Sequence, residues 1–238
     1  MLTETNAIVL RTIKYSETSV IAHIYTEQFG NGSYIMNNVR TNHSKMAMFQ
    51  PLSFVHISVV RKKTPKQIHR ITNISFQLVP TDITANVFKS TIALFVGEIT
   101  DKVFKEEERC DAVFQYLKSF VFLLEESKTN FANLHILYLL HLTRFLGFFP
   151  QNNFTPQTNI FSLLNSQFIS PNGLHENLSL EQSRLFSLII NSEELTDVLE
   201  LNRQERQQLL DILLLYYDYH ICKTQQLTSL GILKMVFE

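Results

Sequence analysis

Hydrophobic positions alternate along the first third of the chain with the two-residue period of β-strands. The run Phe54–Arg61 shows this most clearly, because Val55, Ile57 and Val59 fall on one face. Four further runs are rich in β-branched and aromatic residues, and glycine and proline residues mark the turns between them. Five short strands in roughly 80 residues favour a small antiparallel barrel. The predicted strands are Asn6–Thr12, Val20–Thr26, Ser33–Val39, Phe54–Arg61 and Ile68–Leu78.

The period changes after Pro80, where apolar residues begin to recur at three and four positions as in α-helices. We therefore predict an α+β, multidomain protein, with a β-barrel in residues 1–80 and an all-helical domain in residues 81–238. Capping boxes, Ser179 with Gln182 and Asn202 with Glu205, mark two helix starts, whereas residues 150–175 are polar and predicted as loop. The predicted buried faces are Ile83, Val87, Thr91, Leu94 and Phe95; Val113, Tyr116, Leu117, Phe120 and Leu124; Leu185, Leu188 and Ile189; and Leu209, Leu210, Leu213 and Tyr217.

The charge is distributed unevenly along a chain that is otherwise ordinary in composition. Its 238 residues are 45% hydrophobic and 18% charged, enough apolar material for a sizeable core. The formal net charge is −1, but residues 1–80 hold nine Lys or Arg and three Glu, which leaves +6 there and −7 in the remainder. This asymmetry indicates a polyanion-binding segment attached to another domain. The alternative, that the charges only decorate solvated faces, stays open.

Several classes of protein are excluded by what the sequence lacks. The longest nearly apolar stretch, His135–Pro150, is shorter than the roughly 20 residues of a membrane-spanning helix, and the N-terminus does not resemble a signal peptide. We therefore expect a cytoplasmic protein that does not enter the membrane. Two cysteines are too few for a disulfide framework or a cysteine zinc site. His175-Glu176 begins like the zinc motif HExxH, but Ser179 replaces the second histidine. No catalytic residue, metal site or cofactor is predicted.

Two histidines and an arginine lie on the most apolar predicted helix. His135 and His141 are six residues apart and point to different faces, so structural roles are favoured over metal binding. Arg144 either extends to the surface around its aliphatic stem or binds an acidic peptide that ends in an aromatic residue. In the second interpretation the guanidinium is surrounded by Leu140, Phe145 and Phe148.

Cations gather in the segments that join the predicted strands, where small barrels of this kind bind nucleic acid. Cations follow phosphates, and the rings of Tyr15, Tyr25 and Tyr34 could stack on bases, although packing inside the barrel is favoured for the latter two. No helix for reading base edges is evident, so binding is expected to tolerate any sequence. The predicted DNA-binding residues are Arg11, Lys14, Tyr15, Arg40, Lys45, Arg61, Lys62, Lys63 and Lys66.

The chain resembles the RecO family of bacterial recombination mediators, most clearly over residues 1–60. The family opens with an apolar strand, a Y-x-E-x-S turn and a T-E-x-x-G motif, and it has a basic segment after the third strand. A QP(F/L) motif precedes its fourth strand, L-G-(Y/F) ends a central helix, and L-(K/T)-S begins the last helix. The matching residues here are Ile8–Arg11, Tyr15–Ser19, Tyr25–Gly30, Arg40–Lys45, Gln50–Leu52, Leu146–Phe148 and Leu227–Ser229.

The resemblance implies an OB-fold followed by a helical domain, without catalytic residues. It implies a nucleoid-associated protein that binds single- and double-stranded DNA, anneals complementary strands and works with RecR to load RecA onto strands coated by single-strand-binding protein. It also implies that the helical domain recognises the acidic C-terminal tail of that protein, for which Arg144 is the candidate residue. Many relatives hold zinc with four cysteines in the segment equivalent to residues 150–175, which here contains none. Two alternatives stay open, an interaction adaptor that does not bind DNA and a metal-dependent enzyme acting on nucleic acid.

Overall fold

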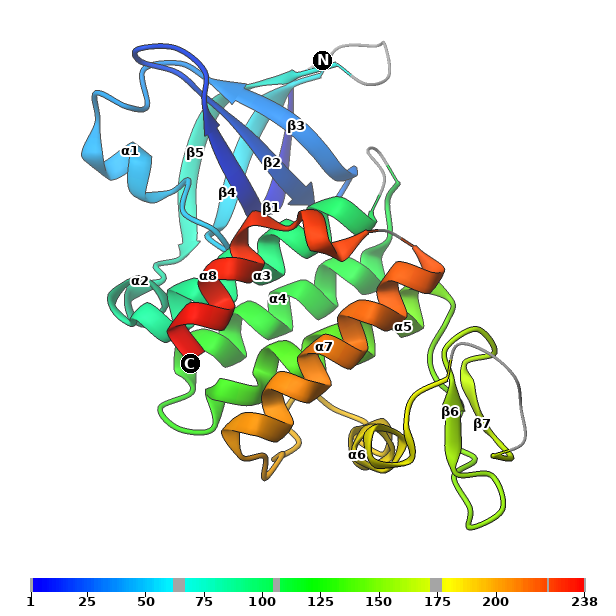
Figure 1. Ribbon diagram of the computed structural model, residues 1–238. Coiled ribbons are helices and arrows are strands. Elements are labelled where there is room, and N and C mark those ends of the chain that lie inside the picture. The colour runs from blue at the N-terminus through cyan, green and yellow to red at the C-terminus, as the bar shows by residue number, and fades with distance from the viewer. Residues whose placement is uncertain (1, 62–66, 105–107, 172–176, 222, 238) are drawn as a thin grey trace. The chain divides into compact units, whose positions relative to one another are not determined.

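The computed structural model describes residues 2–61, 67–104, 108–171, 177–221 and 223–237 (Figure 1). The chain forms two compact units. The first consists of Met1–Glu126 together with Leu227–Val236, and the second consists of Ser127–Gln226 with Phe237–Glu238. None of the described helices is long and apolar enough to cross a membrane.

A closed five-stranded barrel forms the start of the first unit, in the order β1-β2-β3-β5-β4 (Figure 1). This is the predicted OB-fold. The prediction of a purely antiparallel barrel was wrong in one place, because β3 and β5 close the barrel as a parallel pair. A parallel neighbour requires a crossover connection, and α1 together with β4 forms it here. The elements are β1 (Leu2–Lys14), β2 (Val20–Thr26), β3 (Gly30–Met36), α1 (His43–Ala47), β4 (Phe54–Val60) and β5 (His69–Leu78).

Strand β1 is long enough to pair with two neighbours in succession. Its first half pairs with β4, from Leu2 opposite Val60 to Ile8 opposite Phe54, and its second half continues along β2 as far as Lys14. The register of the β1–β2 pairing shifts between Val9 and Arg11, as at a β-bulge. Alternate residues point inward, and the barrel core includes the three predicted residues of β4 among Ala7, Val9, Ala22, Ile24, Tyr34, Val55, Ile57, Val59 and Ile71.

The helices of the first unit include one break that the sequence pattern did not predict. Asn86 has an extended backbone and its side chain accepts hydrogen bonds from the N–H groups of Phe88 and Lys89, so it ends one helix and starts the next. The helical phase is reset there, and Val87 and Leu94 are exposed although they were predicted to be buried. The helices are α2 (Thr81–Ala85), α3 (Val87–Val103), α4 (Asp111–Glu126) and α8 (Thr228–Phe237).

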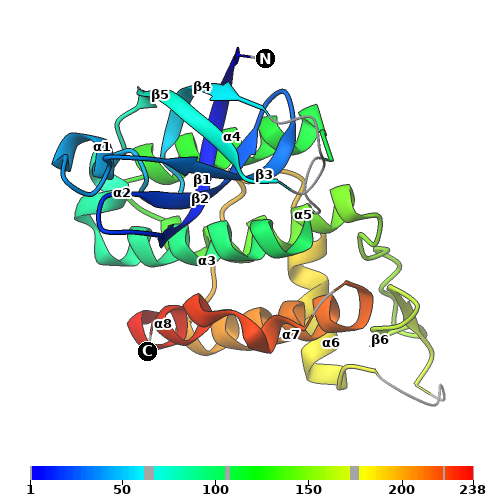
Figure 2. The same cartoon turned by 90° about the horizontal axis from the view of Figure 1, so that it is seen from above.

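Helix α3 runs beside strands β1 and β2 of the barrel (Figure 2). The approach is close at Gly97, where an added Cβ would lie 2.2 Å from the carbonyl oxygen of Leu10. Glycine is therefore the residue that permits this contact. Helix α8 is joined to α3 by Glu98, whose carboxylate accepts from the N–H groups of Thr228 (3.0 Å) and Ser229 (2.8 Å).

The second unit is helical, with one small sheet in the segment predicted as loop. Phe161 and Phe168 face each other across this two-stranded hairpin and are both buried, so short apolar runs within a polar segment were sufficient to form strands. Both capping boxes are present as predicted, whereas Leu188 is exposed. The elements are η1 (Phe131–Asn133), α5 (Leu134–Leu146), β6 (Ile160–Ser162), β7 (Gln167–Ile169), α6 (Leu180–Ile190), α7 (Arg203–His220) and η2 (Thr224–Gln226).

Candidate nucleic-acid interface

The turn between β1 and β2 is tied to the segment that leaves β3. The N–H groups of Val39 and Arg40 both donate to the carbonyl oxygen of Thr18, at 2.9 and 3.1 Å. The Arg40 guanidinium in turn donates to the carbonyl oxygen of Ser16 at 2.5 Å. These contacts join two loops into one surface at this end of the barrel.

This surface brings together four of the predicted DNA-binding residues, and we call it the basic end: Lys14, Tyr15, Arg40 and Lys45. Lys14 and Arg40 are exposed, Lys45 is half-buried in α1, and Tyr15 is 62% exposed. The exposed Glu17 in the same turn offsets one of the three positive charges. Cations beside an exposed ring are the combination with which proteins bind the backbone and bases of single strands.

Arg11 lies elsewhere and forms an ion pair within the protein. Its Nε donates to Oδ2 of Asp101 at 2.5 Å, and the other carboxylate oxygen contacts Nδ1 of His23 at 3.0 Å and Nδ2 of Asn31 at 3.2 Å. Burial raises the pKa of Asp101, but its hydrogen bonds and the charges of His23 and Arg11 outweigh this and hold the pKa below its usual range. The charge of Arg11 is thus already matched by a carboxylate on α3.

Sequence reasoning missed Asp101 because it lies 90 residues from Arg11. The available signal was an acidic residue among the apolar positions of a helix, where a carboxylate needs a partner. Through these contacts Asp101 holds α3 against β1, β2 and β3. It thereby covers part of the outer barrel face on which OB-folds commonly bind nucleic acid.

Arg61 lies near the start of β1, whereas the basic end lies where that strand finishes. It directly follows Val60, which pairs with Leu2 at the start of β1, whereas Lys14 is the last residue of that strand. The Arg61 guanidinium lies 4.0 Å from the centre of the Phe29 ring. The remaining predicted residues of this loop, Lys62, Lys63 and Lys66, lie outside the described residues.

The other two tyrosines pack in the interior, as favoured from the sequence. Tyr34 belongs to the barrel core, and Tyr25 is fully buried with its ring edge toward Phe104, 5.8 Å between centres. Burial raises the pKa of Tyr25 above its usual value. Neither ring is available to a nucleic-acid base, which leaves Tyr15 as the exposed member of the three.

Arg144 of the second unit is exposed, but its surroundings differ from those predicted. Leu140 and Phe148 are buried, so they do not surround the guanidinium at the surface. The guanidinium instead lies 4.4 Å from the centre of the Phe149 ring. It also donates to the carbonyl oxygen of Glu193 at 3.1 Å. A cation held over a ring remains a suitable contact for a carboxylate.

The histidines on α5 and the hairpin give no sign of a metal centre. His135 and His141 are both buried, and Nε2 of His141 contacts the carbonyl oxygen of Ser192 at 2.9 Å. Among the described residues, no group of three or more His, Cys, Asp or Glu could hold a metal ion. The hairpin segment contains no cysteine and packs phenylalanine rings instead, with 5.0 Å between the centres of Phe161 and Phe168. These residues do not fit zinc.

Comparison with known proteins agrees with this architecture. Residues 1–77 match the family model described as Recombination protein O N terminal, and residues 85–229 match Recombination protein O C terminal. The chain is 32% identical to the DNA repair protein RecO of Bacteroides fragilis, 31% to that of Phocaeicola vulgatus and 32% to that of Flavobacterium psychrophilum. In each case the alignment covers 100% of both proteins. The chain therefore belongs to the RecO family of DNA repair and recombination proteins.

Proposed function

We propose that this protein is a non-enzymatic mediator of recombination that binds single- and double-stranded DNA through the basic end. Its role in DNA repair and recombination follows from its family. The observation that carries the DNA-binding assignment is the basic end itself, where two loops joined by hydrogen bonds present Lys14, Tyr15, Arg40 and Lys45 together. Within the described part of the chain, none of these three cations forms an ion pair, unlike Arg11.

Cations on a joined surface bind DNA mainly by releasing the counterions condensed on the phosphates. Such binding depends strongly on salt and little on base sequence. The same cations reduce the repulsion between two polyanions, so annealing of complementary strands is expected from the same surface. In the cell we propose that this activity works with RecR to load RecA onto strands coated by single-strand-binding protein.

The salt dependence of DNA binding tests this proposal. Replacing Lys14, Arg40 and Lys45 with Gln removes up to three phosphate contacts, so the slope of log affinity against log salt should flatten by up to about 2 for single strands. Annealing rates should fall in parallel. The measurement is fluorescence anisotropy with a labelled oligonucleotide over a range of salt concentrations.

A control with the same loss of charge is available in the second unit, where three exposed cations can be replaced with Gln: Arg184, Arg203 and Lys223. This control should retain the slope of the parent protein. A third variant, with Gln at Lys62, Lys63 and Lys66, asks whether the other basic loop contributes. If the basic-end variant keeps both affinity and slope while the variant at Lys62, Lys63 and Lys66 loses them, DNA binds through that segment and the assignment to the basic end is wrong.

We also propose that Arg144 contributes to binding the acidic tail of single-strand-binding protein. The support is local, an exposed guanidinium placed over the Phe149 ring within a net acidic region of the chain. Arg144→Glu should weaken binding of a tail peptide and leave the affinity for naked DNA unchanged. Unchanged peptide affinity would place the tail site elsewhere.

A further inference from the structure

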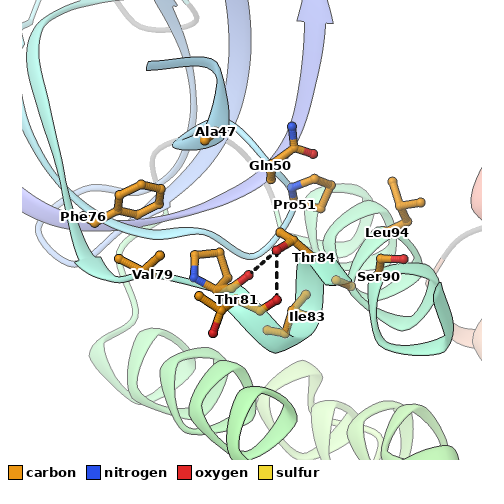
Figure 3. A pocket seen from close by; sticks show the side chains of 12 residues that line it. Ala47, Gln50, Pro51, Phe76, Val79, Thr81, Ile83, Thr84, Ser90 and Leu94 are labelled. Atoms are coloured by element: carbon orange, nitrogen blue, oxygen red, sulfur yellow. Dashed lines mark hydrogen bonds between the residues drawn. The ribbon is translucent and has the colours of Figure 1, made fainter. Parts of the chain in front are cut away.

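A pocket of about 490 Å³ opens in the first unit among residues of α1, β5, α2 and α3 (Figure 3). Ala47 of α1 and the following Gln50-Pro51 form one side, Phe76 of β5 lies across from them, and α2 and α3 close the rest. This volume falls within the range of roughly 300–1,000 Å³ that is typical of small-ligand sites. Nothing in the proposed DNA contacts described so far uses it.

The lining of the pocket combines flat apolar faces with a few uncharged polar groups. Pro51, Phe76 and Pro80 present rings, as Figure 3 shows for the first two. None of the described residues that line the space is charged. The exposed Gln50 carries an amide that can both donate and accept, and the hydroxyl of Thr84 lies among the lining groups. Flat faces with polar groups at the edge suit a planar heteroaromatic ring better than an aliphatic side chain.

The position of the pocket connects it to the candidate DNA path. Lys45 and Ala47 belong to the same short helix, so α1 contributes to both the basic end and the rim of the pocket. The hydroxyl of Thr12 donates to the carbonyl oxygen of Phe49 at 2.8 Å and fixes the segment after α1 against β1. A strand whose phosphate contacts Lys45 is therefore within reach of the pocket rim at Ala47. Among the described residues the lining holds no acidic side chain, and the neighbouring Asp82 is paired with Lys89.

We propose that this pocket takes one unstacked nucleobase of a single strand bound at the basic end. The proposal rests on the proposed function and extends it, because it names the part of the DNA that is recognised. Proteins that bind single strands pair cations with surfaces on which bases stack. Tyr25 and Tyr34 are buried, so Tyr15 is the one of the three tyrosines that offers such a surface, and the pocket adds a second. A base in a duplex is already paired and stacked, so the pocket favours single strands over double strands.

Filling the pocket tests this directly. Ala47 is exposed at the rim, so Ala47→Phe should block the space without disturbing the core. We expect the affinity for an oligo-dT strand to fall about tenfold, the order expected for losing one stacked base, while duplex affinity and the salt slope stay unchanged. Ala112→Phe, at an exposed helical alanine of α4 in the same unit, is the matched control and should bind like the parent.

A second measurement uses the DNA as the variable. A strand with abasic residues keeps its phosphates but offers no ring, so the parent should bind it about tenfold more weakly, and Ala47→Phe should show no further loss. If Ala47→Phe binds single strands as tightly as the parent, the pocket does not take a base. An equal loss of affinity for single and double strands would also overturn the proposal. Failure of the proposed function would look different, because the basic-end variant would then bind every DNA like the parent.

Discussion

The interiors of the two units differ in the side chains that they bury. The first unit buries charged side chains beside charged partners, as with Asp101, whose carboxylate pairs with the exposed Arg11. The second unit buries aromatic rings and neutral histidines, as with Phe161 and His135. Because charged and neutral groups respond differently to acid and to substitution, the two units are expected to lose stability under different conditions.

A second charged network in the first unit shows how completely such groups are matched. Lys89 is fully buried on α3, and its Nζ donates to Oδ2 of Asp82 at 2.5 Å and to the carbonyl oxygen of Glu125 at 3.1 Å. The Glu125 carboxylate accepts from the N–H groups of Asp82 (2.8 Å) and Ile83 (2.9 Å) at the start of α2. Burial raises the pKa of Glu125, but these hydrogen bonds outweigh it and lower the pKa overall.

The second unit relies on ring packing and on a histidine that stays neutral. Phe161 contacts three rings edge to face, with centres 4.7 Å from Phe186, 5.0 Å from Phe168 and 5.6 Å from Tyr216. Burial, together with the nearby charge of Arg206, lowers the pKa of His135 to about 3. No charge has to be matched in this core while His135 remains unprotonated.

The largest expected effect comes from opening the aromatic core of the second unit. Phe161→Ala removes a fully buried ring that three other rings contact, and should cost about 4 kcal/mol of unfolding free energy. Hydrogen exchange followed by mass spectrometry should show faster exchange in residues 127–226 and little change in the barrel. Phe154→Ala, at a half-buried ring of the same region, should cost less than half as much. An equal increase in the exchange rates of both units would show that they unfold together.

The next effect probes the charged network of the first unit. Asp82→Asn leaves the buried ammonium of Lys89 without its carboxylate and should cost about 3 kcal/mol, because removal of one partner exposes the full cost of burying the other. Lys89→Met removes the charge while keeping the aliphatic stem, and should cost less, since the half-exposed Asp82 can turn to water. Chemical denaturation of both variants measures the difference. If Lys89→Met lost more unfolding free energy than Asp82→Asn, this account would be contradicted.

Lowering the pH should destabilise the second unit more than the first, and this effect should be smaller than those of the two substitutions above. Between pH 6.5 and about 3 the unfolded chain protonates His135 whereas the folded protein does not, so stability falls as the pH drops below 6.5. At pH 5 this amounts to about 2 kcal/mol relative to pH 7. The pKa values of Asp101 and Glu125 are lowered, so their contributions persist at pH 5 and are lost only as the pH falls below the usual carboxyl range.

Hydrogen exchange at pH-corrected rates should therefore show the second unit opening first as the pH is lowered from 7 to 5. His135→Gln should reduce this pH dependence without abolishing it, because burial also lowers the pKa of His141. If the first unit opened first, the charged networks rather than the neutral histidines would govern the response to acid.

The smallest expected effect is that of a chelator. The hairpin of the second unit is packed by rings and residues 150–175 contain no cysteine, so EDTA should change neither the unfolding midpoint nor DNA binding. A tightly bound stoichiometric zinc in the purified protein would contradict this and make the second unit metal-dependent.

The sequence predicted best those features that are set by neighbouring residues. The β4 alternation and both capping boxes depend on spacings of two or three residues and are present in the structure. The parallel closure by β3 and β5 was not predicted, because it depends on the path of the whole chain. Asn86 was missed because its side chain starts a new helix within one apolar pattern.

The residues of the candidate site also fall into those that sequence reasoning grouped correctly and those that it did not. Lys14, Tyr15, Arg40 and Lys45 come together because hydrogen bonds join the segments that follow β1 and β3, across 21 to 24 residues of sequence. Arg61 was grouped with them because it lies in a basic segment between predicted strands, but it follows Val60, which pairs with the start of β1, far along that strand from Lys14. The ion pair of Arg11 required knowledge of where α3 lies, which no local pattern contains.

The contact between Glu98 and helix α8 has a consequence for synthesis. Unit 1 is discontinuous, because residues 127–226 are made between α4 and the helix that Glu98 holds through Thr228 and Ser229. Chains fold as they emerge from the ribosome, at about 5–20 residues per second, so α3 waits at least several seconds for α8. During that interval the surface of α3 that receives α8 is open to other proteins, and the barrel unit is completed only after the second unit has left the ribosome.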